Sequence, residues 1–409
     1  MERNNKNKME NFNGVYISSK TTEFLINLSK FVYIFGFPNY WVEDLDISDK
    51  FKNILEMLSK YGNWSMVIMM LSEYAAFFTQ RNLTERQSSN QILFTISHTI
   101  VNGFCLCIGY QKLQIKDVMY TLGIGLKQAY NDKDVERRMI KRSMFYSFAL
   151  ILNCVLSVSM FTYDAIRMVL RTGVTFNTII AAWPDVEDKS VIANIGRTIF
   201  YIFWWIYMTR TFAVYSLVIC LAIALSHQFM NLNSYFYSLT SIFDENKTQS
   251  EKEEEYEKAL KVGIKMHSET LKCTNDVQVI FRDVFSGQVI FNLTMLILLM
   301  YQTMNSPRNL TNALTLMFTA LSILLSTGFF MWNAGDTTVE AEKVSTAMYS
   351  SGWENCGHAS SVRVRKLLVI AMMQAQKPVI LKGLGVILLS YQSYVSIVKS
   401  SYSIFSVIY

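Results

Sequence analysis

The sequence predicts an all-α membrane protein with seven transmembrane helices, a cytoplasmic N-terminus, an extracellular C-terminus and a divided seventh helix. The 409 residues are 51% hydrophobic and only 17% charged, which is too apolar for an ordinary soluble protein. The apolar residues gather in segments of about 20 residues, a helix length that crosses a hydrocarbon core about 30 Å thick. The four prolines fall between these segments, as expected of a helical chain.

The chain begins with a polar segment, which is followed by the first span. Residues 1–51 are mostly polar, but an apolar patch from Phe31 to Trp41 interrupts them. This patch is too short to cross a bilayer, so we expect it to lie in the membrane interface. The first span covers roughly 54–79, and its marginal hydrophobicity indicates a helix that packs more on protein than on lipid.

Five further apolar segments predict spans two to six. They are residues near 89–110, Ser143–Tyr163, about Thr198–Ala224, 284–305 and 310–333. Between spans four and five, residues 247–258 carry charges of both signs and predict a solvated helical extension. Glu73 and Arg210 are charged residues inside spans, and we expect each to be paired or to lie beside an aqueous vestibule.

The last span is expected to be divided. An apolar run from Leu367 to Gln376 is broken by Lys377-Pro378, and the final helix is expected to start near Gly383 and to run to Tyr409.

Small hydroxyl residues follow one face of this final helix. They recur three and four residues apart, and the next position in their register is a branched apolar residue: Ser393, Ser396, Ser400, Ser403 and then Val407. Such a stripe suits a narrow, watery pore that closes at a hydrophobic constriction. It equally suits a face that packs against another helix, because serine is common where membrane helices touch. The pattern alone leaves both interpretations open.

The distribution of lysine and arginine sets the orientation of the spans. With a cytoplasmic N-terminus, the inside segments hold 25 of these residues and the outside loops hold six. Cytoplasmic loops are typically enriched in positive charge, so we expect the N-terminus inside and the C-terminus outside. A G-protein-coupled receptor has the opposite orientation.

Several function classes lack support in the sequence. No nucleophile elbow, phosphate-binding loop or zinc-protease motif is present, so we expect no enzyme and no cofactor. The four histidines lack metal-ligand spacing, and four of the six cysteines lie in apolar segments, which argues against a metal site or a disulfide framework. The basic residues are scattered among loops, so we expect no nucleic-acid partner.

The C-terminal third holds a series of short motifs, which are Gly335-Asp336, Ala347-Met348-Tyr349 with Trp353, Gln374-Ala375-Gln376-Lys377-Pro378, and the segment from Ser390-Tyr391 to Tyr402-Ser403. Together these motifs resemble the insect odorant receptors. The Phe-Gly-Phe-Pro38 stretch is also similar to the segment that precedes the family's first span. Tyr394 and Ile404 depart from the residues that are usual in the family.

The resemblance implies a subunit of a ligand-gated, non-selective cation channel. It implies a heterotetramer with co-receptor subunits, a small volatile odorant as ligand, and permeant monovalent and divalent cations. The protein would lie among lipid in the plasma membrane of sensory neurons. The connection at about 226–275 is short, whereas the co-receptor type has a long insertion there, so we expect an odour-specific subunit.

The resemblance also implies a division of the chain. Residues 1–51 would form a cytoplasmic segment with the interfacial patch, and residues 52–333 would form the first six helices with a ligand pocket in their outer half. Residues 334–381 would anchor the subunits in the cytoplasm and include the first part of helix seven. Residues 382–409 would line the pore, with the gate at Val407, the position that the serine register also reaches.

Candidate ligand-binding residues follow from the implied depth of the pocket. They are aromatic and hydroxyl side chains in the outer half of spans two, three, four and six: Phe94, His98, Ser157, Phe161, Phe203, Tyr207, Thr319 and Ser322. Aromatic walls with a few hydroxyls suit small apolar molecules, although each residue alone equally suits core packing. Two other functions stay open, a gustatory-type receptor channel and a secondary transporter, but the gustatory C-terminal signature and the transporter's paired repeats are both missing.

Overall fold

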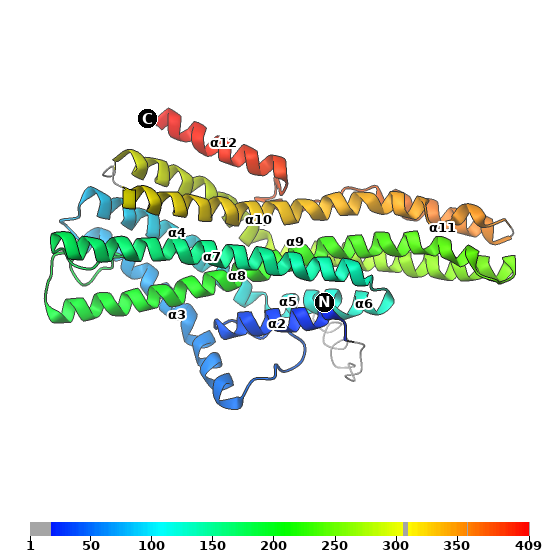
Figure 1. Ribbon diagram of the computed structural model, residues 1–409, viewed down its shortest axis with the longest axis horizontal. Helices are drawn as coiled ribbons and strands as arrows, with labels where there is room; N and C mark the ends of the chain where they lie inside the picture. The colour runs from blue at the N-terminus through cyan, green and yellow to red at the C-terminus, as the bar shows by residue number, and fades with distance from the viewer. Residues whose placement is uncertain (1–17, 306–309, 358, 409) are drawn as a thin grey trace.

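The computed structural model describes residues 18–305, 310–357 and 359–408. These residues form an elongated bundle of long helices, with one short β-hairpin near the C-terminal end (Figure 1). The predicted all-helical class is therefore confirmed for this part of the chain.

The elements follow one another in a simple order. The first half of the chain contains α2 (Lys20–Ile34), α3 (Asp49–Thr79), α4 (Glu85–Tyr110), α5 (Lys112–Tyr120), a π-helical turn (Thr121–Gly125), α6 (Leu126–Ala129) and α7 (Lys133–Thr172). The second half contains α8 (Val191–Ser238), a 3-10 helix (Leu239–Asp244), α9 (Gln249–Asn305), α10 (Leu310–Tyr349), a 3-10 turn (Trp353–Asn355), α11 (Ala359–Ala375), β1 (Lys382–Gly383), β2 (Ile387–Leu388) and α12 (Tyr391–Ile408).

Polar caps determine where several of these helices begin. Thr84 starts α4 with a capping box, in which its side chain accepts a hydrogen bond from the Gln87 backbone N–H. The Asp132 side chain caps α7 and the Ser190 side chain caps α8. Gly173 ends α7 in the left-handed conformation, which favours glycine.

Five of the described helices are long and apolar enough to cross a membrane. They are α4, α7, α8, α9 and α10, so the protein is a multi-pass membrane protein. Helices α3 and α12, which correspond to the predicted first and last spans, are not among these five. The central helix is α8, since 89% of its most apolar stretch is buried, whereas only 22% of that of α7 is buried.

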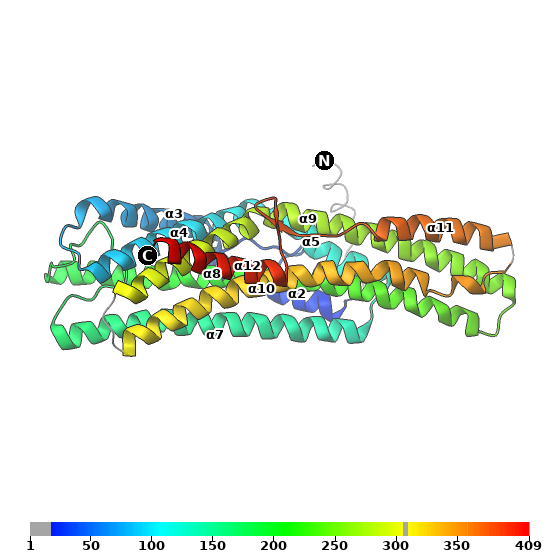
Figure 2. The ribbon, with the colours of Figure 1, turned by 90° about the horizontal axis from the view of Figure 1, so that it is seen from above.

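The longest helices continue well beyond the predicted spans. Helix α9 has 57 residues, which corresponds to about 85 Å and exceeds a hydrocarbon core of about 30 Å. Its first ten residues belong to the charged segment 247–258, which was predicted to be a solvated helical extension. Figures 1 and 2 show that the extensions of α9 and α10 and the helix α11 form one narrow end of the bundle.

The divided last helix is present, but its second part starts later than predicted. Residues Lys382 to Leu388 form an antiparallel hairpin in place of the helix that was expected from Gly383 onward. The hairpin turns through Leu384 and Gly385, which both have positive φ angles. The Gln278 side chain of α9 holds β1, since its Oε1 accepts from the Lys382 N–H at 2.6 Å. Helix α12 therefore begins at Tyr391.

The apolar patch before α3 is packed against protein. Phe37, Tyr40 and Trp41 are each at most 1% exposed, and the Tyr40 hydroxyl donates to the Ile108 carbonyl at the end of α4. These side chains therefore contact the helices of the bundle, whereas the sequence predicted that they would lie in the membrane interface.

Arg210 of α8 fixes the same patch from inside the bundle. Its guanidinium donates to the Gly36 carbonyl at 3.0 Å and to Asn63 Oδ1 at 2.5 Å, and it lies 4.6 Å from the centre of the Phe37 ring. It also lines a cavity that is shared with Tyr110 and Asp283. The sequence predicted that this charge is paired or lies beside an aqueous vestibule. In the structure, uncharged acceptors bind the guanidinium, and it lies at the edge of a cavity.

Candidate ligand-binding site

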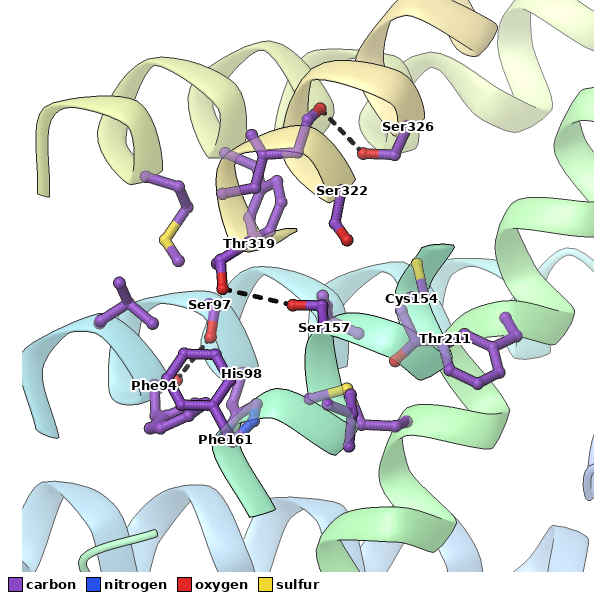
Figure 3. Close-up of a pocket in the computed structure, with 18 of the residues that line it drawn as sticks. Phe94, Ser97, His98, Cys154, Ser157, Phe161, Thr211, Thr319, Ser322 and Ser326 are labelled. Carbon is purple, nitrogen blue, oxygen red and sulfur yellow. Dashed lines mark hydrogen bonds between the residues drawn. The ribbon is translucent and has the colours of Figure 1, made fainter. Parts of the chain in front are cut away.

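A largely apolar cavity of about 120 Å³ lies where α4, α7, α8, α9 and α10 meet (Figure 3). Its lining residues are Leu93, Phe94, Ser97, His98 and Val101 of α4; Cys154, Ser157, Val158 and Phe161 of α7; Trp204, Met208, Thr211, Phe212 and Tyr215 of α8; Phe291 and Met295 of α9; and Thr319, Ser322, Ile323 and Ser326 of α10. An apolar cavity of about 150 Å³ in another protein stays dry and binds benzene, so this volume suits a small organic molecule.

One wall of the cavity is a cluster of aromatic rings. The Phe94 ring meets Phe161 edge to face at 5.1 Å and Trp204 edge to face at 5.5 Å, and it stacks on His98 at 5.6 Å. Contacts of this geometry are favourable beyond the burial of area, and they fix the positions of the rings. The wall is therefore a preformed surface for apolar and aromatic groups.

The hydroxyl groups on the other side tie α7 to α10. Ser157 Oγ and Thr319 Oγ1 lie 3.3 Å apart, and the Asn153 amide donates to Ser322 Oγ at 2.9 Å (Figure 3 shows the first pair). The Ser97 hydroxyl donates to the Phe94 carbonyl of its own helix. Because the protein already satisfies these hydroxyls in part, they contribute shape and weak polarity more than strong binding to a ligand.

A buried pair of ionisable residues supports the aromatic wall. His98 Nδ1 lies 2.7 Å from Glu73 Oε1 of α3, and both side chains are 1% exposed. The Tyr207 hydroxyl donates to the His98 carbonyl, and the two rings are 4.7 Å apart. Glu73 is thus paired, as expected for a charged residue inside a span. His98 Nε2 and Glu73 Oε2 have no hydrogen-bond partner among the described residues.

Trp204 provides a buried donor at the cavity. Its side chain is 0% exposed, and its Nε1, which can only donate, has no hydrogen-bond partner among the described residues. Buried N–H groups are normally paired, so unpaired ones at a cavity point to a ligand or a water as partner.

The cavity gathers six of the eight residues that the sequence suggested. These are Phe94, His98, Ser157, Phe161, Thr319 and Ser322. Phe203 is 44% exposed and points away from the cavity, and Tyr207 is buried behind His98 without lining it. On α8 the cavity-lining residues are Trp204, Met208, Thr211, Phe212 and Tyr215, a face that is one residue further along the helix. Whether any of these residues binds a ligand stays a prediction.

Sequence reasoning chose the wrong face of α8 and left out α9. The α8 residues share a helical face, since they recur at spacings of three and four, and their aromatic and sulfur-containing side chains were the available signal. Helix α8 is apolar on all sides, however, so its pattern did not distinguish this face from the others. Phe291 and Met295 of α9 were missed because the family resemblance placed the pocket among other helices.

The serine stripe of α12 faces mainly away from the rest of the chain. Ser396, Ser400 and Ser403 are exposed, whereas Ile397 and Ser401 on the adjacent face are buried at 6% and 0% exposure. Figure 1 shows α12 lying on the outside of the bundle, and it contacts α9 and α10.

The two other predicted pore residues are Ser393 and Val407. Ser393 is half-buried and accepts a hydrogen bond from the Ser390 hydroxyl at 3.1 Å. Val407 lies in the last turn of α12, but its side chain lies outside the described residues.

Helix α10 connects the cavity to α12. Asp336 of α10 accepts a hydrogen bond from the Tyr391 hydroxyl of α12 at 2.7 Å, and its other oxygen pairs with Arg142 of α7. The rings of Tyr391 and Tyr394 both contact Trp332 of α10. The start of α12 is therefore held by the same helix that contributes Thr319 and Ser322 to the cavity.

This architecture is similar to that of solved protein structures. The chain is similar in structure to the insect olfactory receptor OR5 from Machilis hrabei in complex with eugenol, with a TM-score of 0.77, 13% identity, and coverage of 94% of this chain and 97% of that one. A second structure of the same receptor gives a TM-score of 0.75 at 14% identity, with the same coverage. No curated protein sequence matches the chain. The family model described as 7tm Odorant receptor matches residues 82–402. Since that match spans most of the chain, the protein belongs to the odorant receptor family.

Proposed function

We propose that the chain is an odour-specific subunit of a ligand-gated, non-selective cation channel. It would assemble with co-receptor subunits as a heterotetramer in the plasma membrane of sensory neurons, with seven spans, the N-terminus inside and the C-terminus outside. Membership of the odorant receptor family supports this proposal, and so does the excess of lysine and arginine in the inside segments. The observation that carries it is a preformed apolar cavity inside the membrane bundle.

The proposed ligand is a small, volatile and largely apolar molecule that offers a hydrogen-bond acceptor. The cavity volume of about 120 Å³ limits its size, and the aromatic wall provides dispersion contacts and apolar burial. The buried donor Trp204 Nε1 favours a ketone, ester or ether oxygen over a hydrocarbon of the same shape. The structurally similar receptor OR5 from Machilis hrabei is in complex with eugenol.

The exposed face of α12 supports the proposed pore. The stripe is exposed at Ser396, Ser400 and Ser403, so no other described helix of the subunit covers it there. This weakens the interpretation that the stripe packs against another helix of the same subunit. Copies of this face from several subunits would surround a pore that hydroxyls line and Val407 closes. Asp336 and Tyr391 would then transmit a displacement of α10 at the cavity to the pore helix. No observation favours a transporter or a gustatory-type receptor.

The cavity is tested by filling it in cells that express the chain together with its co-receptor. The substitution Ser157→Phe places a ring in the cavity, so the concentration for half-maximal odorant-evoked current is expected to rise at least about tenfold, equivalent to about 1.4 kcal/mol. Ser159→Phe on the same helix does not reach the cavity and is expected to change it less than about threefold. Dose–response curves of whole-cell current measure both.

Three results would contradict the proposal. Equal shifts in the two variants would place the ligand elsewhere. A ligand-evoked current of the unaltered chain that needs no co-receptor would contradict the heteromeric assembly, and ligand-driven transport without channel current would contradict the channel itself.

The ligand chemistry is tested by removing one donor. The substitution Trp204→Phe keeps the aromatic wall but deletes the N–H, so a ketone agonist is expected to lose about three- to tenfold in potency. A hydrocarbon agonist of the same skeleton is expected to change less than about twofold. Trp205→Phe, one residue further and outside the cavity lining, is the matched control. If Trp204→Phe weakens both agonists equally, the N–H has no role in recognition.

The gate is tested at Val407. The substitution Val407→Ser makes the proposed constriction polar, which favours its wetting, so ligand-free current is expected to rise at least about twofold. Val395→Ser, on the same helix and nearer its start, is expected to leave the basal current unchanged. Patch-clamp recordings of basal current and of relative ion permeability measure both effects. If neither quantity responds to Val407→Ser, the constriction lies at another residue.

A further inference from the structure

A polar cavity lined by four lysines lies on the side of the bundle, where α3 begins and α5 follows the end of α4. It has a volume of about 440 Å³, and its basic residues are Lys52 and Lys60 of α3 and Lys112 and Lys116 of α5. Only two carboxylates, Asp44 and Glu56, share this lining. Four positive charges and two negative charges leave two positive charges without local compensation.

The lysines of α5 carry this excess charge. Lys52 pairs with Asp44 at 3.4 Å, whereas no ion pair within the described residues involves Lys112 or Lys116. These two lysines are four positions apart, so they share one face of the helix and repel each other. Burial lowers the pKa of Lys116, and the neighbouring charge of Lys112 lowers it further. An anion in the cavity would relieve both effects.

The surroundings of the cavity are apolar and aromatic. Tyr110 and Leu113, on either side of Lys112, are 86% and 63% exposed, and Tyr61 and Trp64 of α3 are 57% and 67% exposed. In a multi-pass membrane protein such side chains face lipid, and exposed tyrosine and tryptophan mark the level of the headgroups. The cavity therefore opens where lipid headgroups meet the hydrocarbon core.

We propose that this cavity binds an anionic phospholipid of the cytoplasmic leaflet. Lys112 and Lys116 donate to the headgroup phosphate, and Lys60 adds a third positive charge at the cavity edge. The acyl chains lie against Tyr110, Leu113 and the exposed apolar face of α3. A headgroup with two negative charges, such as a phosphoinositide monophosphate, matches the excess charge. The assignment to the cytoplasmic leaflet rests on the proposed orientation.

The experiment measures binding of a short-chain phosphatidylinositol 4-phosphate to the purified full-length chain. Removing both charges with Lys112→Gln and Lys116→Gln is expected to weaken binding about 30-fold, since each lysine near a membrane surface contributes about 1 kcal/mol. The matched control is Arg138→Gln with Lys141→Gln, which removes two exposed charges from α7 and is expected to change binding less than about threefold. Lys112→Gln alone provides a milder variant, with an expected loss of about fivefold.

Three results would overturn the lipid site. The first is an equal loss of lipid affinity in the two double variants. The second is binding of phosphatidylcholine with the same acyl chains as tightly as the phosphoinositide. The third is equally tight binding of the soluble inositol phosphate, which would assign the cavity to a free phosphate. The measurement uses no odorant, co-receptor or current. Failure of the proposed channel function would therefore leave its outcome unchanged.

Discussion

The carboxylate of Asp336 joins the three parts of the molecule on which the proposed function depends. It accepts a hydrogen bond from Tyr391 at the start of α12 and pairs with Arg142 of α7. The 17 helical residues that separate it from Thr319 span about 25 Å, so α10 connects the cavity to the last helix as one rigid element. A ligand that shifts α10 relative to α7 would act on the contact between α10 and α12. Such a shift could break the charge-assisted hydrogen bond from the Tyr391 hydroxyl to Asp336.

The sequence predicted the fold class and part of the cavity, because both depend on patterns that are long or local. Apolar segments of membrane-spanning length located α4, α7, α8, α9 and α10, and the positions at one depth brought six of the eight candidate residues to one cavity. The face of α8 was missed by one residue, because a helix that is apolar all round has no amphipathic signal. The hairpin before α12 was missed, since Leu384 adopts a positive φ angle that no residue preference predicts.

The cavity combines an apolar wall with an unpaired donor, and in the proposed function this combination defines what the chain selects. Dispersion and apolar burial are nondirectional, so Phe94 and Phe161 would accept many small molecules. Buried donors such as Trp204 Nε1 are directional, and a ligand without an acceptor leaves them unsatisfied. The fold is shared with a receptor that is only 13% identical in sequence, so the shape of the bundle tolerates wide changes in sequence.

The position of a bound ligand tests the central claim most directly. A cryo-electron microscopy map of the purified heteromeric receptor, recorded with a saturating ketone agonist and again without it, would show where the agonist lies. The account predicts ligand density between α4, α7, α8 and α10, with the ketone oxygen within hydrogen-bonding distance of Trp204 Nε1. Density at any other place, with this cavity unchanged between the two maps, would contradict it.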